Sequence, residues 1–374
     1  MRVAIVHDWL VTDSGAEKVL RAILECYPAA EIFSLVDFLS ERSRRNVLMG
    51  KRAHTSFIQS LPLSQSRFRY YLPLFPKAIE SLELQGYDLV ISSSWAVAKG
   101  VKKRSGALHI SYCHTPVRYA WDLYDEYTRS LTQPKKWLVQ RTLQAIKAWD
   151  FRVSDRVDFF IANSAFVKER IRSNYGREAE VIHPPVDTGA FRCGHLKEDF
   201  YLTVSRLVPY KKTQMIVEAF NRSGRPLVVI GGGEEFNAVK EIAGPNVRVL
   251  GWQSRDVVID HMQRARGFVY AAEEDFGIVT VEAMSCGTPV IAYGVGGVRD
   301  SVVEGETGLF FDQQTPGSLN EAVERFETMH FDAEVISKHA GLFDVKHFKA
   351  KFRAYTKQKL QKHFAKMGNG NEDR

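Results

Sequence analysis

The chain has 374 residues, of which 45% are hydrophobic and 25% are charged, values typical of a globular protein. This length suits two domains better than a single core. No apolar run approaches the roughly 20 residues of a membrane-spanning helix. The opening MRVAIVHDWL is interrupted by Asp8 and has no small-residue cleavage site after it, which argues against a signal peptide. The composition therefore excludes disordered, fibrous and membrane-spanning classes.

The formal net charge is +7, and the whole excess falls in the first half of the chain. Residues 1–190 hold 27 Lys and Arg against 20 Asp and Glu, whereas residues 191–374 hold 24 of each. This asymmetry indicates an anionic partner for the first half, either nucleic acid or lipid. The four cysteines form no C-x-x-C pair, which favours a reduced, cytoplasmic setting over a zinc ribbon or a disulfide framework.

Short β-branched runs alternate with helical patterns along the chain. In the first half we expect strands at 3–9, 32–38, 89–94, 108–113 and 159–164, with helices such as 16–26 and 137–152 between them. The pattern restarts after an aperiodic, proline-containing linker at 183–199, with strands at 200–205, 226–231, 247–250, 267–272, 289–293 and 308–311. Repeated strand–helix units predict parallel sheets that helices cover on both faces.

We therefore expect an α/β chain of two doubly wound, Rossmann-like domains, at 1–187 and 188–345. Residues 346–374 follow as a C-terminal helix that returns to the first domain and ends in a frayed tail. Its apolar stripe consists of Val345, Phe348, Phe352 and Tyr355. Doubly wound sheets bind ligands at the carboxyl ends of their strands. If the two domains face each other, the active site lies in the cleft between them.

The segment 270–297 carries the densest set of candidate site residues, YAAEEDFGIVTVEAMSCGTPVIAYGVGG. An acidic turn follows a strand, and a helix is expected over 278–285, so its first amides face a possible phosphate. Glu274 and Glu282 are too far apart to share one proton, but as ionised carboxylates they can accept hydrogen bonds from hydroxyl groups. The pattern predicts a diphosphate held between two sugars.

This string, E-x7-E followed by Ala-Met-Ser-Cys-Gly-Thr-Pro-Val, resembles the signature of family 4 glycosyltransferases, retaining enzymes of the GT-B fold that use nucleotide sugars. The resemblance implies that Glu282 holds the ribose and Glu274 the hydroxyls of the transferred hexose. It also implies that the backbone amides of Phe276, Gly277 and Ile278 orient the sugar and the phosphate.

Further matches to the family lie earlier in the second half. Arg206-Leu-Val-Pro-Tyr-Lys211 resembles R-L-x-x-x-K, whose two cations suit a departing diphosphate, although Lys212 is an alternative to Lys211. The turn Gly231-Gly-Gly-Glu234 resembles the family's glycine-rich turn, or is only a tight turn. Gly251, before Trp252, resembles the segment that frames the nucleotide base.

The first half carries two more matches. The loop from Thr12 to Glu17 resembles the family's G-G-x-E loop at the donor phosphates, with Gly15 in place but Ser14 where many members have glycine. His114 resembles the histidine near the transferred sugar. Its wider string H-T-P-V-R-Y-A-W-D resembles bacterial mannosyltransferases of surface polysaccharide and O-antigen assembly, and this alone favours GDP-mannose as the donor.

A basic segment at 42–79 holds eight Lys and Arg and no Asp or Glu, with aromatic residues between them. Arg67, Arg69, Tyr70 and Tyr71 are the candidates for contact with the acceptor or with an anionic membrane surface. The alternative is a solvated basic face. With the first interpretation, the enzyme is cytoplasmic and peripheral on the inner face of the plasma membrane, and its acceptor is a lipid-linked saccharide.

The resulting hypothesis is a retaining hexosyltransferase of lipopolysaccharide or polysaccharide biosynthesis, with Glu274, His114, Arg206 and Lys211 as catalytic candidates. No D-x-D motif lies beside the donor segment, so we expect no metal and no other cofactor. The alternatives are a UDP-sugar-dependent family 4 enzyme, a GT-B sugar-nucleotide epimerase and a basic nucleic-acid-binding protein. The last has no recognisable motif in the sequence, so we expect no nucleic-acid partner.

Overall fold

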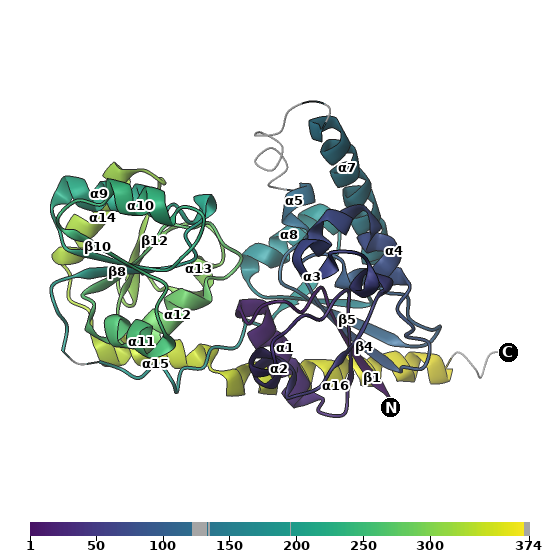
Figure 1. Ribbon diagram of the computed structural model, residues 1–374. Helices are drawn as coiled ribbons and strands as arrows, with labels where there is room; N and C mark the ends of the chain where they lie inside the picture. Colours follow the sequence, from purple (N-terminus) through teal and green to yellow (C-terminus); the bar gives the residue numbers. More distant parts are fainter. Residues whose placement is uncertain (122–132, 134, 195, 370–374) are drawn as a thin grey trace. The chain divides into compact units, whose positions relative to one another are not determined.

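The computed structural model describes residues 1–121, 133, 135–194 and 196–369 (Figure 1). The chain divides into two compact units. Unit 1 comprises Met1–His183 and Phe348–Arg374, and unit 2 comprises Pro184–His347. Each unit has its own buried apolar core and its own sheet. Among the described residues, no helix is both long enough and apolar enough to cross a membrane.

Unit 1 is built on a parallel sheet whose strand order is β3-β2-β1-β4-β5-β6-β7. The strands are β1 Val3–His7, β2 Glu31–Ser34, β3 Ala53–Thr55, β4 Leu89–Ser94, β5 Leu108–Cys113, β6 Phe159–Ala162 and β7 Ala179–Val181. The central strands β4 and β5 are buried along their whole length, as helices on both faces of a parallel sheet require. The sequence pattern missed β3 and β7, because three residues are too few to show a period.

Helices surround this sheet (Figure 1). They are α1 Gly15–Cys26, α2 Glu41–Leu48, α3 Ser64–Arg67, α4 Phe75–Glu80, α5 Arg118–Trp121, α7 Lys135–Val153, α8 Ala165–Tyr175 and α16 Val345–Asn369, with 3-10 turns η1 Phe57–Ser60, η2 Phe68–Leu74, η3 Ala98–Gly100 and η4 Ser154–Arg156. Because Pro73 lies within η2 and Pro76 within α4, the basic segment forms short helices rather than one long helix.

The last helix, α16, packs on unit 1 through Phe348 and Phe352 of the predicted apolar stripe, whereas Val345 of that stripe belongs to unit 2 and its backbone N–H donates to Val186 O. Phe348 and Phe352 are 3% and 0% exposed. Thr356 Oγ1 lies 2.6 Å from the hydroxyl of Tyr27, and Lys349 pairs with Glu25 at 3.0 Å. The helix therefore completes the covering of unit 1, although the whole of unit 2, Pro184–His347, separates it in sequence from the rest of that unit.

Unit 2 is also built on a parallel sheet, with strand order β10-β9-β8-β11-β12-β13. Its strands are β8 Tyr201–Val204, β9 Leu227–Ile230, β10 Val247–Gly251, β11 Gly267–Tyr270, β12 Val290–Tyr293 and β13 Gly308–Phe311. Its helices are α9 Thr213–Ser223, α10 Phe236–Ile242, α11 Arg255–Arg264, α12 Ile278–Ser285, α13 Val298–Ser301, α14 Pro316–Glu327 and α15 Ala333–Ala340, with η5 Pro209–Lys211 and η6 Gly341–Phe343. The order reverses between β8 and β11, and such a reversal is where doubly wound sheets bind ligands.

The two doubly wound sheets confirm the predicted α/β class. Within unit 2, α12 has the predicted bounds, and each expected strand of this unit is present within one or two residues at either end.

Candidate active site

The loops that follow β8 and β11 meet at the carboxyl edge of the unit 2 sheet, because these two strands are paired neighbours. Lys211 Nζ lies 2.5 Å from Glu274 Oε1, and the two side chains are 12% and 21% exposed. Of the two adjacent lysines, Lys211 is therefore the one that meets this carboxylate. Lys212 instead adopts a left-handed backbone, φ +56°, as the cap that precedes α9.

Tyr270, the last residue of β11, holds the other oxygen of this carboxylate. Its hydroxyl donates to Glu274 Oε2, and its side chain is buried. Burial, together with the neighbouring carboxylate, raises the pKa of Tyr270 well above its ordinary value, so the phenol stays protonated and remains a donor. Sequence reasoning missed this residue. The available signal was its place as the last strand residue, four positions before Glu274.

Two glycines after β12 let a second loop lie against the acidic turn. Gly297 N donates to the carbonyl oxygen of Glu274 at 2.8 Å. A Cβ atom on Gly296 would lie 2.4 Å from that oxygen, and one on Gly297 would lie 2.1 Å from Asp275 O. Since side chains do not fit there, these glycines set the path of the backbone that carries Glu274.

The helix α12 begins directly after this turn. Gly277 caps it with a left-handed backbone, φ +83°. The Thr280 N–H donates to the Gly277 carbonyl oxygen at 3.0 Å, so the amides that the helix offers to an anion are those of Ile278 and Val279. The side chain of Phe276 is buried against Phe343, so only its backbone can face a ligand. Glu282 lies half-buried in the second turn of α12, and Ile278 opens the helix.

Arg206 lies in the loop after β8, and its side chain is exposed. The glycine turn packs against the same loop, because a Cβ atom on Gly231 would lie 1.8 Å from Ser205 O and one on Gly233 would lie 2.2 Å from Leu207 O. Gly251, at the end of β10, accepts a backbone hydrogen bond from Gly231 N at 2.9 Å. The structure thus gives Gly231 and Gly233 a packing role, in which they bring the loop of Arg206 close to β9.

In unit 1, His114 follows β5 and is half-buried. Its Nε2 lies 2.8 Å from Ser93 Oγ, at the end of the adjacent strand β4. Desolvation, with a smaller effect of the nearby His7, lowers the pKa of His114 to about 3, so the ring is neutral near pH 7. Gly15 begins α1, where the Ser14 backbone N–H donates to Glu17 Oε2 at 3.1 Å.

Asp8 fixes the loop next to Ser93, a role that the sequence did not reveal. Its buried carboxylate accepts hydrogen bonds from four successive backbone N–H groups of residues 95–98, at 2.6 to 2.9 Å. The only sequence signal was a charged residue that interrupts the first apolar run.

The candidate residues for the acceptor or the membrane lie on α3 and η2. Arg67 and Arg69 are exposed, and Tyr70 is 79% exposed. Tyr71 is half-buried and its hydroxyl donates to Pro62 O at 2.7 Å. Within the wider string around His114, Asp122 lies outside the described residues.

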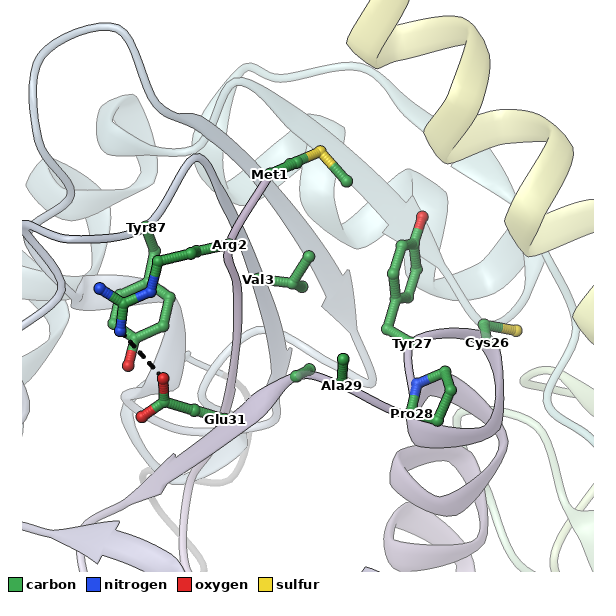
Figure 2. Close-up of a pocket in the computed structure, with 10 residues that line it drawn as sticks. Met1, Arg2, Val3, Cys26, Tyr27, Pro28, Ala29, Glu31 and Tyr87 are labelled. Carbon is green, nitrogen blue, oxygen red and sulfur yellow. Dashed lines mark hydrogen bonds and ion pairs between the residues drawn. The ribbon is translucent and has the colours of Figure 1, made fainter.

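A pocket of about 390 Å³ lies at the opposite end of the unit 1 sheet, at the starts of β1 and β2. Figure 2 shows Tyr27 and Tyr87 on either side of it, with the ion pair of Arg2 and Glu31 at one margin. Burial and the hydrogen bond with Glu31 raise the pKa of Tyr87 to about 12. This pocket contains none of the candidate site residues. Among the described residues, no group of three or more His, Cys, Asp or Glu side chains is arranged to hold a metal ion.

Comparison with known families divides the chain much as the fold does. Residues 14–190 match Glycosyltransferase Family 4, and residues 193–340 match Glycosyl transferases group 1. The solved structure of HepE from Anabaena in complex with UDP has a similar fold, with a TM-score of 0.69 and 18% identity, and the match covers 96% of this chain and 100% of that one.

Two curated relatives match over part of the sequence. An uncharacterized glycosyltransferase of Methanocaldococcus jannaschii is 29% identical over 171 residues, which are 44% of this chain and 48% of that protein. A GDP-mannose-dependent alpha-(1-6)-phosphatidylinositol monomannoside mannosyltransferase of Mycobacterium tuberculosis is 28% identical over 204 residues. This match covers 46% of this chain and 53% of that protein. The chain thus spans about half the length of the curated relatives it matches.

Proposed function

Because the chain belongs to the group 1/family 4 glycosyltransferases and has their GT-B fold, we propose that it moves a mannose from GDP-mannose to a lipid-linked saccharide with retention of configuration. The observation that carries this proposal is the cluster of Lys211, Glu274 and Tyr270 beside the first turn of α12. It combines a cation and helix amides, which suit a diphosphate, with a carboxylate that suits sugar hydroxyls.

The donor residues have separate tasks in this proposal. The first amides of α12 and the cations of Arg206 and Lys211 bind the diphosphate and stabilise its growing charge as the glycosidic C–O bond breaks. Glu274, held by Tyr270, accepts hydrogen bonds from the hexose, and Glu282 does so from the ribose. The acceptor oxygen then bonds to the anomeric carbon on the face that the diphosphate leaves, and its proton passes to the departing phosphate oxygen.

Two observations bear on the donor, and they differ. The string from His114 to Trp121 and the mycobacterial relative's name both favour GDP-mannose. The structures of HepE with UDP and with UDP-glucose favour a UDP-sugar, the second candidate. Calorimetric titration with GDP-mannose, UDP-glucose and UDP-N-acetylglucosamine, in the presence of EDTA, separates these cases. Binding of GDP-mannose alone supports the proposal and metal-free binding, whereas preference for a UDP-sugar refutes the mannosyl assignment.

Replacing the sugar-binding carboxylate tests the site itself. We expect Glu274→Ala to lower transfer by about 10- to 100-fold, because a hydrogen bond to a charged group contributes about 1.5–3 kcal/mol. Binding of GDP alone should persist. Glu273→Ala is the matched control, since this neighbouring carboxylate is exposed. Equal transfer rates for Glu274→Ala and the wild-type protein would remove Glu274 from the proposed site.

The acceptor side of the proposal depends on an exposed face of unit 1. On α3 and η2, Arg67 and Arg69 accompany Tyr70, and on α7, Trp137 and Leu138 are 53% and 62% exposed. These elements are neighbours, because Leu72 of η2 packs with the cluster that holds Ile146 of α7. Cations beside exposed aromatic and aliphatic groups fit an anionic bilayer, where a lipid-linked acceptor would lie.

Flotation with vesicles tests this docking. We expect the protein to bind vesicles that contain phosphatidylglycerol, and the binding to weaken as salt rises, because the Debye length shortens. The double variant Trp137→Ser/Leu138→Ser should weaken binding even at low salt. The variant Lys346→Ser serves as the control, since its charge lies at the start of α16, away from α7 in sequence. If the protein binds no vesicles at any salt concentration, the docking proposal fails and the basic segment 42–79 is a solvated face.

A further inference from the structure

A chain of polar side chains runs through unit 1 from α1 to the end of β5. Glu17 Oε1 lies 3.7 Å from His7 Nε2. The other nitrogen of that ring, Nδ1, lies 3.1 Å from Ser93 Oγ, and this hydroxyl in turn lies 2.8 Å from His114 Nε2. Glu17, His7 and Ser93 are 2%, 0% and 0% exposed, so bulk water does not compete for these groups.

The hydroxyl in the middle of this chain limits the protonation of both rings. Ser93 has one hydrogen to donate, and its Oγ has no other hydrogen-bond partner among the described residues, so this hydrogen is used only when Ser93 donates to one imidazole nitrogen and accepts from the other. Either His7 Nδ1 accepts and His114 Nε2 carries a proton, or both roles are reversed. The two histidines cannot choose their tautomers independently.

The charge of Glu17 favours one of the two orientations of the Ser93 hydroxyl, the one in which it donates to His7. Burial alone would raise the pKa of its carboxyl, but the His7 ring and the Ser14 hydroxyl hold it below its ordinary value, so it is ionised near pH 7. The distance of 3.7 Å to His7 Nε2 is too long for a hydrogen bond. A negative charge at that distance nevertheless favours an N–H over a lone pair. This nitrogen has no other hydrogen-bond partner among the described residues.

The proton positions then follow from one end of the chain to the other. When the His7 ring is neutral and carries its proton on Nε2, its Nδ1 accepts from Ser93, and Ser93 accepts from Nε2–H of His114. A second proton on His7 would make its Nδ1 a donor and would reverse both bonds, a case that places the proton of His114 on Nδ1. We propose that Glu17, His7 and Ser93 are positioning residues that hold His114 as the Nε2–H tautomer, which leaves its Nδ1 as an acceptor for a hydroxyl of a bound sugar. Only the identity of that ligand rests on the proposed function.

The tautomer can be measured directly on the full-length protein without any donor. In protein labelled with 15N-histidine, long-range 1H–15N spectra separate a protonated ring nitrogen from an unprotonated one, and the signals of His114 are assigned through the variant His114→Gln. We expect the wild-type spectrum at pH 7 to show the proton of His114 on Nε2. A proton on Nδ1 would overturn the proposal.

Two variants test whether the hydrogen-bonded side chains of Glu17, His7 and Ser93 set the tautomer of His114. Ser93→Ala should give His114 a mixture of tautomers. Ser92→Ala is the matched control, because it removes the same kind of buried hydroxyl–histidine bond, to His109 Nε2 at 2.9 Å, from the adjacent position of β4. Glu17→Gln keeps the shape but can donate to His7 Nε2, so it should shift His114 toward the Nδ1–H form. A wild-type His114 signal in both Ser93→Ala and Glu17→Gln would overturn the proposal.

Kinetics separates this proposal from the proposed function. With an active donor, Ser93→Ala and Glu17→Gln should lower kcat by about threefold to tenfold, the equivalent of one neutral hydrogen bond, with little change in the donor KM. Ser92→Ala should leave kcat unchanged. If no donor is turned over, the proposed function fails while the tautomer measurement stands. If transfer occurs but the variants keep the wild-type kcat, the positioning role fails.

Discussion

At the scale of single residues, one ion pair lies fully buried in the core of unit 1. Lys99 Nζ lies 2.5 Å from Asp150 Oδ1, and both side chains are 0% exposed. The hydroxyl of Tyr175 and the indole N–H of Trp121 donate to Asp150 Oδ2 at 2.6 and 2.9 Å. Buried charges are tolerated when they are paired and hydrogen-bonded, and this carboxylate satisfies both conditions.

Removing one partner of this pair should therefore destabilise unit 1. We expect Asp150→Ala to lower the free energy of unfolding by about 3–5 kcal/mol, because it leaves a buried ammonium group unpaired. The double variant Lys99→Met/Asp150→Ala should recover part of that loss, since no charge remains. Urea denaturation measures both variants. If the double variant were the less stable of the two, the unpaired charge would not be the cause.

At the scale of elements, the acidic turn and α12 depend on a neighbouring loop. The turn holds Glu274, and the backbone of Gly297 lies against it without room for a Cβ atom. The bounds of α12 followed from local signals, the glycines on either side of it and Pro289 beyond. The position of the turn follows instead from contact between loops that come after different strands.

A methyl group in this contact should impair donor binding more than it impairs folding. We expect Gly297→Ala to push the Asp275 carbonyl away and to weaken nucleotide-sugar binding by about tenfold or more, the equivalent of at least one lost contact of about 1.4 kcal/mol. Gly317→Ala is the control, because a Cβ atom on Gly317 of α14 meets nothing within 4 Å. Calorimetry gives the two affinities, and equal values would show that the turn adapts without cost.

At the scale of the whole molecule, the chain forms two units with separate cores, and its last helix belongs to the first of them. Phe352 of α16 is fully buried, and the centroid of its ring lies 6.5 Å from the centroid of the Tyr27 ring. Unit 1 is thus closed by a segment that is synthesised after unit 2. Its stability should depend on residues at both ends of the sequence.

We expect Phe352→Ala to destabilise unit 1 by about 3–5 kcal/mol, the usual cost of a large cavity in a core. Unit 2 should keep its stability, because its core shares no side chain with Phe352. Hydrogen exchange read by mass spectrometry resolves the two units. Lys351→Ala, at an exposed neighbouring position, serves as the control. Equal loss of protection in both units would show that they unfold as one.

The sequence by itself determined the fold class, most of the strands and α12, because each depends on local patterns of apolar residues and on glycine or proline at the ends. It also pointed to Glu274, Lys211 and His114, through motifs that follow strand ends. Only the tertiary structure placed Tyr270 and Lys211 on the carboxylate of Glu274 and linked Glu17 to His114 through His7 and Ser93. The short strands β3 and β7 likewise form only where longer neighbours offer them hydrogen bonds. These features join residues that are distant in sequence, and parallel pairing of strands is what brings such residues to the same edge of a sheet.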